Sequence, residues 1–265
     1  MSRLTAMFER LRAERRTGLL AYVTAGYPSP ADTVPIVQAL IEGGADAVEL
    51  GIPFSDPLAD GATIQRANQT ALAHGVSLAD VLGMVRNLRA AGVTAPLLVM
   101  GYVNPLESYG LERFGRDAAA AGLDGMICVD LPPEEADPYE AVCRAHTLDL
   151  IFLVAPTSTD ERLAEVARRA SGFIYCVSVT GTTGARSGVA ADLAAFIARV
   201  RAQSVLPLAV GFGVSTAEHV ARIGQLCEAA VIGSAIIDTI ERAKPGEEAE
   251  NVRAYVEVVT GRQRV

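Results

Sequence analysis

Two acidic residues, Glu49 and Asp60, lie at the two ends of one short segment that could carry chemistry. The segment is Val48-Glu-Leu-Gly-Ile-Pro-Phe-Ser-Asp-Pro-Leu-Ala-Asp-Gly61. Glu49 lies in its apolar beginning, where an ionisable side chain is costly unless it is paired or used. Asp60 ends the loop that follows, which contains two prolines. We therefore expect the function of the chain to be located here.

The two carboxylates are expected to differ in environment. If Glu49 faces a cavity among apolar neighbours, burial raises its pKa and lets it exchange protons near neutral pH. Asp60 is expected to be better solvated and to stay ionised, so the pair could divide proton transfer from charge stabilisation. The alternative is that Glu49 points outward and forms an ion pair with an arginine. Asp56 is expected to cap the loop or contact a partner.

The composition is typical of an α/β protein with a large core. The 265 residues are 50% hydrophobic and 20% charged, with 24 glycines and no tryptophan. The net charge of −8 argues against a nucleic-acid surface and against binding to an anionic membrane. The four cysteines show no CxxC spacing, so buried thiols in a reducing, cytoplasmic compartment are expected.

Short apolar runs alternate with segments of helical period along the whole chain. Strands are predicted at 18–23, 47–50, 97–101, 125–129, 150–154, 173–177, 208–211 and 230–232. Helices are predicted at 31–43, 62–72, 78–91, 111–121, 133–145, 160–170, 192–203 and 216–224. Continuously apolar strands are buried on both faces, as in parallel sheets.

Eight such units without a linker predict a single (β/α)8 TIM barrel domain over residues 1–265, with an open doubly wound sheet as the alternative. An extra N-terminal helix at 4–15 could close one end of the barrel. The eighth unit carries extra helices, a short one after Gly233 and a longer one near 247–260. Similar segments at 44–49 and 122–127 indicate weak internal repetition.

Glycine-rich loops after the late strands could bind an anion. Gly211-Phe-Gly213 follows the seventh strand and Gly233-Ser234 follows the eighth. Backbone N–H groups at a helix start bind phosphate without lysine or arginine, although ordinary tight turns have the same composition. The loop 178–188 is rich in Gly, Thr and Ser, which favours a mobile lid over a passive loop.

The segment from Glu49 to Gly61 resembles the signature of the tryptophan synthase alpha chain family. The similarity runs the whole length, because the other loop motifs also fall where the family has its loops. These motifs are Thr24-Ala-Gly-Tyr-Pro28, Asn104-Pro105, Asp130-Leu-Pro-Pro133, Thr183-Gly184, Gly211-Phe-Gly213 and Gly233-Ser234.

The resemblance implies a carbon–carbon lyase of tryptophan biosynthesis that cleaves indole-3-glycerol phosphate to indole and D-glyceraldehyde 3-phosphate by a retro-aldol reaction. It implies that Glu49 protonates indole C3 and handles the glycerol hydroxyl proton, while Asp60 binds the indole N–H and stabilises the cation. The implied substrate-binding residues are Tyr22, Ile64, Tyr175 and Thr183. The implied phosphate-binding residues are Gly184, Gly211, Gly213, Gly233 and Ser234.

The resemblance also implies a partner. Indole would pass to a beta chain in an α2β2 heterotetramer, with Pro53, Asp56 and Asn104 at the interface. No cofactor and no metal are expected in this chain, because the pyridoxal phosphate belongs to the beta chain. A stand-alone indole-3-glycerol phosphate lyase and a non-catalytic, phosphate-binding activator of a partner are the alternatives.

The residue inventory agrees with carboxylate chemistry. A Schiff-base aldolase needs a lysine in the barrel, and the one lysine, Lys244, lies in a polar segment. A metal aldolase needs clustered histidines, and the three histidines are widely separated. Two departures from the family are local: Tyr22 stands where some members carry Phe, and Val179-Thr180 stands where some carry an arginine.

Overall fold

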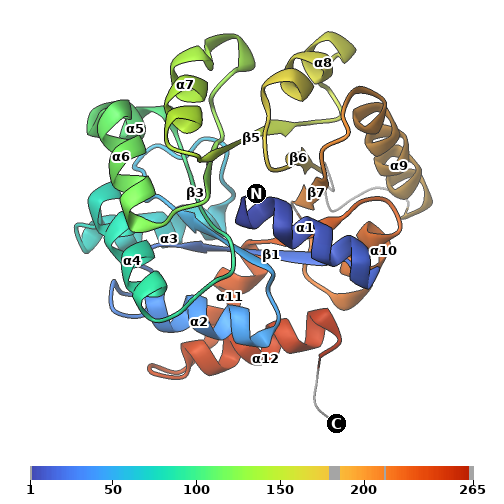
Figure 1. Cartoon of the computed structure of the whole chain (residues 1–265). Helices are drawn as coiled ribbons and strands as arrows, with labels where there is room; N and C mark the ends of the chain where they lie inside the picture. Colours follow the sequence, from blue (N-terminus) through green and yellow to red (C-terminus); the bar gives the residue numbers. More distant parts are fainter. Residues whose placement is uncertain (1, 179–185, 212, 263–265) are drawn as a thin grey trace.

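Eight parallel strands close into one barrel, in the order in which they occur along the chain (Figure 1). The computed structural model describes residues 2–178, 186–211 and 213–262. The strands are β1 (Gly18–Thr24), β2 (Ala47–Gly51), β3 (Leu97–Gly101), β4 (Gly125–Cys128), β5 (Asp149–Val154), β6 (Ile174–Val177), β7 (Leu208–Gly211) and β8 (Ala229–Ile232). The predicted TIM barrel is confirmed, and the open sheet is wrong.

Helices surround the barrel, and those of the described residues follow the predicted alternation. They are α1 (Arg3–Glu14), α2 (Thr33–Gly43), α3 (Ala62–Ala73), α4 (Leu78–Ala90), α5 (Val103–Tyr109), α6 (Leu111–Ala121), the 3-10 turn η1 (Pro133–Glu135), α7 (Asp137–Ala145), α8 (Asp160–Arg169), α9 (Arg186–Gln203), α10 (Ala217–Gly224), α11 (Ser234–Arg242) and α12 (Glu248–Thr260). The extra helices of the eighth unit are confirmed as α11 and α12, and α12 packs against α2.

The seven-residue helix α5 was not predicted. It begins directly after β3, with Tyr102 as its N-cap, and contains Pro105 in its first turn. A proline is tolerated there because the first N–H groups of a helix have no partner within it. The sequence Asn104-Pro105 is therefore compatible with a loop and with a helix start, and only the fold distinguishes them.

The strands are apolar on both faces because they separate two cores. Side chains alternate along a strand, so Leu20 and Tyr22 of β1 belong to the core inside the barrel. Leu19, Ala21 and Val23 belong to the core between the barrel and its helices. This arrangement explains why the strands of the sequence showed no polar alternation.

Helix α1 closes the amino-terminal end of the barrel, as predicted. Its residues Leu4, Met7, Phe8 and Leu11 are buried and belong to the core inside the barrel. Their spacing of three and four places them on one helical face. The ring of Phe8 packs against that of Phe173, with 5.8 Å between centroids. Ligand access is therefore left to the opposite, carboxyl-terminal end.

A repeated hydrogen bond joins consecutive strands at the closed end. In four pairs of neighbouring strands, a side chain one to three residues before the second strand accepts a hydrogen bond from the N–H group of the first or second residue of the first strand. The pairs are Asp46 with Leu19 (3.0 Å), Asp124 with Leu97 (2.7 Å), Ser171 with Leu150 (2.9 Å) and Glu228 with Leu208 (2.9 Å). The internal similarity between segments 44–49 and 122–127 corresponds to two of these positions.

Candidate active site

A cavity of about 280 Å³ opens at the carboxyl-terminal end of the barrel, where barrel enzymes place their sites. It is lined by residues of six strands or of the loops that follow them, together with the starts of α3 and α11. The lining residues are Tyr22, Glu49, Asp60, Gly61, Ile64, Met100, Tyr175, Gly213, Val214, Ser215, Val231, Gly233, Ser234, Ala235 and Asp238. Eight of the predicted site residues therefore meet in one cavity.

Glu49 points into the barrel. It pairs in register with Tyr22 of β1 and Leu98 of β3, both of which belong to the inner core. Its side chain is fully buried, and within the described residues neither carboxyl oxygen has a hydrogen-bond partner. The alternative of an outward ion pair with an arginine is wrong.

The burial of Glu49 has a chemical consequence. Transfer of a carboxylate out of water disfavours its charged form, and this burial raises the pKa of Glu49 from 4.5 to about 8. A group with a pKa near the working pH can both give and take a proton. Glu49 is therefore suited to act as a general acid and as a general base.

Asp60 is in a different environment, at the end of the loop between β2 and α3. It is half-buried, and the Asn68 side chain donates a hydrogen bond to its Oδ2 atom over 3.2 Å. Tyr102 also hydrogen-bonds to the carboxylate. Burial raises the pKa of Asp60 above its ordinary value, and the two hydrogen bonds oppose that rise. Asp60 is more exposed than Glu49, as predicted, although it is not fully solvated.

Two phenols flank Glu49 inside the barrel, and each is accommodated by a glycine. A Cβ atom at Gly51 would overlap the hydroxyl of Tyr22, and one at Gly211 would overlap that of Tyr175. The Tyr22 hydroxyl lies 3.3 Å from the Thr24 hydroxyl. Burial raises the pKa of both phenols, so both stay protonated. Gly211 does not line the cavity.

The other end of the cavity is formed by backbone. Gly233 and Ser234 begin α11, and Gly213 contributes from the loop after β7. The first N–H groups of a helix have no partner within the helix and carry a positive partial charge. This end can therefore bind an anion. Asp238, one turn into α11, lines the cavity too and was not predicted.

Some predicted residues lie elsewhere. Thr183 and Gly184 fall in 179–185, outside the described residues, as do Val179-Thr180 and most of the predicted lid. Of the predicted interface residues, Asp56 and Asn104 are exposed. Pro53 is buried within this chain, so its own side chain presents little surface.

Two residues that sequence analysis missed contact Asp60. Asn68 is in α3 and is 1% exposed, and Tyr102 directly follows β3 and is 5% exposed. Tyr102 could have been found from its place after a strand of the barrel. For Asn68 no sequence signal existed, because an asparagine in a helix is usually a surface residue.

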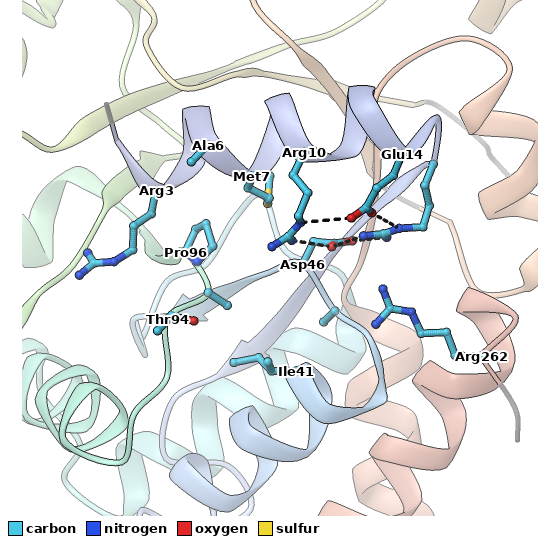
Figure 2. Close-up of a pocket in the computed structure, with 13 residues that line it drawn as sticks. Arg3, Ala6, Met7, Arg10, Glu14, Ile41, Asp46, Thr94, Pro96 and Arg262 are labelled. Atoms are coloured by element: carbon cyan, nitrogen blue, oxygen red, sulfur yellow. Dashed lines mark hydrogen bonds and ion pairs between the residues drawn. The ribbon is translucent and has the colours of Figure 1, made fainter.

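A second cavity, of about 630 Å³, lies at the closed end of the barrel beneath α1 (Figure 2). Arg10 and Arg16 both bond to the carboxylate of Asp46 there, over 3.2 and 2.7 Å. Arg3 bonds to Asp124 over 2.9 Å. These arginines neutralise the carboxylates that hold the strand starts, so this end of the barrel serves stability.

The described residues contain neither a cluster of metal-ligating side chains nor a helix that could span a membrane. Within 2–178, 186–211 and 213–262, no group of three or more His, Cys, Asp or Glu side chains could hold a metal ion. In the same ranges, no helix combines the length and apolar character that crossing a membrane requires. All four cysteines are buried and free.

Comparisons with known proteins agree on one family. The model of the family described as tryptophan synthase alpha chain matches residues 8–264. The tryptophan synthase alpha chain of Roseiflexus castenholzii is 52% identical over 261 residues, covering 98% of this chain and 100% of that protein. That of Chloroflexus aggregans is 52% identical over 266 residues, covering 100% of both.

Solved structures give the same result. The tryptophan synthase subunit alpha from Legionella pneumophila superposes with a TM-score of 0.92 at 40% identity, covering 98% of each chain. Tryptophan synthase from M. tuberculosis, in its aminoacrylate-bound form, superposes with a TM-score of 0.89 at 37% identity, covering 100% of each chain.

Proposed function

The chain belongs to the tryptophan synthase alpha chain family, and from this premise we propose that Glu49 and Asp60 carry its acid–base chemistry. The family's reaction is the cleavage of indole-3-glycerol phosphate to indole and D-glyceraldehyde 3-phosphate, a carbon–carbon lyase half-reaction. The observation that carries the proposal is a glutamate buried in the cavity, with its pKa raised to about 8.

Glu49 acts first as an acid. It donates a proton to C3 of the indole ring, which makes the ring an indoleninium cation. The bond between C3 and the glycerol carbon then breaks, and its electron pair returns to the ring. Glu49, now a carboxylate, accepts the proton of the glycerol hydroxyl, whose oxygen becomes the aldehyde oxygen. The residue ends the reaction protonated, ready for another cycle.

Asp60 stabilises the charge that forms. Its carboxylate accepts a hydrogen bond from the indole N–H group, which becomes more acidic when C3 is protonated. A fixed negative charge in a partly dehydrated site favours this cation more strongly than water does. The two hydrogen bonds from Asn68 and Tyr102 support the ionised form of Asp60.

The remaining lining residues bind the substrate. We assign the indole ring to the region of Tyr22, Ile64 and Tyr175, where the inner core reaches the cavity. We assign the phosphate to the backbone groups of Gly213, Gly233 and Ser234, with Thr183 and Gly184 completing the site. Gly211 contributes indirectly, because it makes room for the Tyr175 hydroxyl.

The members of this family act with a beta chain. We propose an α2β2 heterotetramer in which Asp56 and Asn104 lie at the interface, supported by their exposure in the segments that follow β2 and β3. Pro53, which is buried in the same loop as Asp56, would act there by restricting the backbone. Pyridoxal phosphate belongs to the beta chain, and this chain works without a cofactor.

Free cysteines support a cytoplasmic location, and the closed barrel supports a single domain over residues 1–265.

The test is the variant Glu49→Gln, assayed for release of indole from indole-3-glycerol phosphate. Glutamine keeps the size of the side chain and cannot transfer a proton, so we expect turnover to fall by at least about 1,000-fold. Inhibition by D-glyceraldehyde 3-phosphate should persist, which shows an intact phosphate site. Glu250→Gln, an exposed residue of α12, is the matched control. Retained turnover in Glu49→Gln would refute the proposal.

A further inference from the structure

The catalytic carboxylate Asp60 is not part of a strand or a helix. It ends the loop between β2 and α3, one residue before the N-cap Gly61. A carboxylate that stabilises a cation must be held in place and kept ionised, because movement or protonation removes its effect. The contacts that hold Asp60 therefore bear directly on the reaction.

Tyr102, which directly follows β3, contacts the loop that carries Asp60. Its ring is 5% exposed and lies 5.1 Å from the ring of Phe54, a residue of the same loop as Asp60. The hydroxyl oxygen accepts the N–H group of Ala59 over 3.0 Å. A phenol has a single proton, and a backbone N–H can only donate. The Tyr102 proton is therefore left for the Asp60 carboxylate, with which it is hydrogen-bonded.

Asn68 holds the same carboxylate from α3. It is 1% exposed, and its Nδ2 atom lies 3.2 Å from Asp60 Oδ2. Among the described residues its Oδ1 atom has no hydrogen-bond partner. A buried amide with one unused oxygen costs stability, so the donor bond to Asp60 is the evident gain. Gln65 of the same helix donates to the Asp60 carbonyl oxygen over 2.9 Å.

We propose that Tyr102 and Asn68 are positioning residues that hold the Asp60 carboxylate in place and ionised during the reaction. This inference rests on the role given to Asp60 in the proposed function. The two donors come from separate elements, the end of β3 and the second turn of α3, so they fix the carboxylate from two directions. Both also lower the pKa of Asp60 against the effect of burial.

Other titratable groups share the cavity and must be considered in a pH profile. They are Tyr22 of β1, Glu49 of β2, Tyr175 of β6 and Asp238 of α11. None of these is changed by substitution of Tyr102 or Asn68. If these substitutions shift the acidic side of the plot of kcat against pH, the shift therefore reports on Asp60.

The experiment compares Tyr102→Phe with the wild-type chain in indole release across pH 5 to 9. We expect kcat to fall about tenfold and the acidic limb to move up by about one pH unit, because a donor to the charged form is lost. KM should change less than about twofold, since the phosphate end is untouched. Asn68→Asp replaces the donor by a second negative charge next to Asp60. It should therefore move the acidic limb of the kcat profile to still higher pH than Tyr102→Phe does.

The matched control is Tyr109→Phe. Tyr109 ends the helix that Tyr102 begins, and its hydroxyl also donates to a carboxylate, that of Asp117, over 2.8 Å. This variant should lose comparable stability and keep the wild-type pH profile. If Tyr109→Phe shifts the limb as Tyr102→Phe does, the effect is general and the inference fails.

A double substitution separates the inference from the proposed function. In an Asp60→Asn background, Tyr102→Phe should cause little further loss, because its target is gone. If Asp60→Asn alone retains wild-type turnover, the proposed function is wrong. If Asp60→Asn is inactive while Tyr102→Phe and Asn68→Asp keep the wild-type kcat and profile, the proposed function stands and the inference is overturned.

Discussion

The burial of Glu49 predicts that this residue lowers the stability of the folded chain, and that the loss of stability grows as the pH rises. Its pKa is about 8 in the folded chain and has the ordinary glutamate value near 4.5 in the unfolded chain. Between these pH values the folded state holds a proton that the unfolded state has lost. The free energy of unfolding therefore falls as pH rises through this window. Glu49→Gln removes the effect, because glutamine does not titrate.

The size of the effect follows from the two pKa values. A difference of about 3.5, at 1.36 kcal/mol for each pH unit, corresponds to about 5 kcal/mol when both states are deprotonated. This is an upper limit, since water entering the cavity would reduce it. Such a value is a large share of the stability of a typical domain. We expect the variant to gain up to about 5 kcal/mol over the wild type between pH 5 and pH 8.5.

The measurement is urea unfolding followed by far-ultraviolet circular dichroism, because the chain has no tryptophan. Stabilities of wild type and Glu49→Gln are compared at half-unit steps from pH 5 to pH 8.5. Other titrating groups are common to both chains and cancel in the difference. The control is Gln69→Ala, at an exposed residue of α3, which removes no titratable group and should therefore give a stability difference from wild type that does not change with pH. A stability difference for Glu49→Gln that is the same at every pH would refute the reasoning.

Three further predictions concern the two ends of the barrel. Asp46→Asn should lower the free energy of unfolding by roughly 2–3 kcal/mol in urea, since Arg16 loses its charged partner, and kcat should not change. Gly211→Ala should lower kcat at least about tenfold while inhibition by inorganic phosphate persists, because its Cβ would displace Tyr175. Ser234→Ala should raise KM several-fold at constant kcat, because the hydroxyl binds substrate and transition state alike; a fall in kcat with constant KM would contradict this.

The order of the elements along the chain could be predicted from local chemistry. Runs such as 97–101 are too short and too apolar for anything except a buried strand, and the segments between them carry helical period. Eight repeats of this unit leave the closed barrel as the simplest arrangement. The importance of Glu49 was also visible, because a carboxylate within such a run needs a partner or a use.

The direction of each side chain could not be predicted in the same way. Strands with apolar residues on both faces carry no signal that distinguishes inside from outside. Only the closure of the barrel places Glu49 beside Tyr22 and Tyr175, in a cavity whose described lining residues include no arginine. The same closure brings the hydroxyl of Tyr175 into the space beside Gly211, which a larger residue at that position would fill.

The sequence by itself therefore determined the fold class, the strand order and the two carboxylates that we propose as catalytic. Only the tertiary structure decided how those carboxylates differ. Burial inside the barrel raises the pKa of Glu49 to about 8, and among the described residues no donor to its carboxylate opposes that rise. Asp60 is held by Asn68, eight residues later in the chain, and by Tyr102, the residue that directly follows β3. Desolvation and hydrogen bonding depend on groups distant in the chain, and these come together only when the barrel closes.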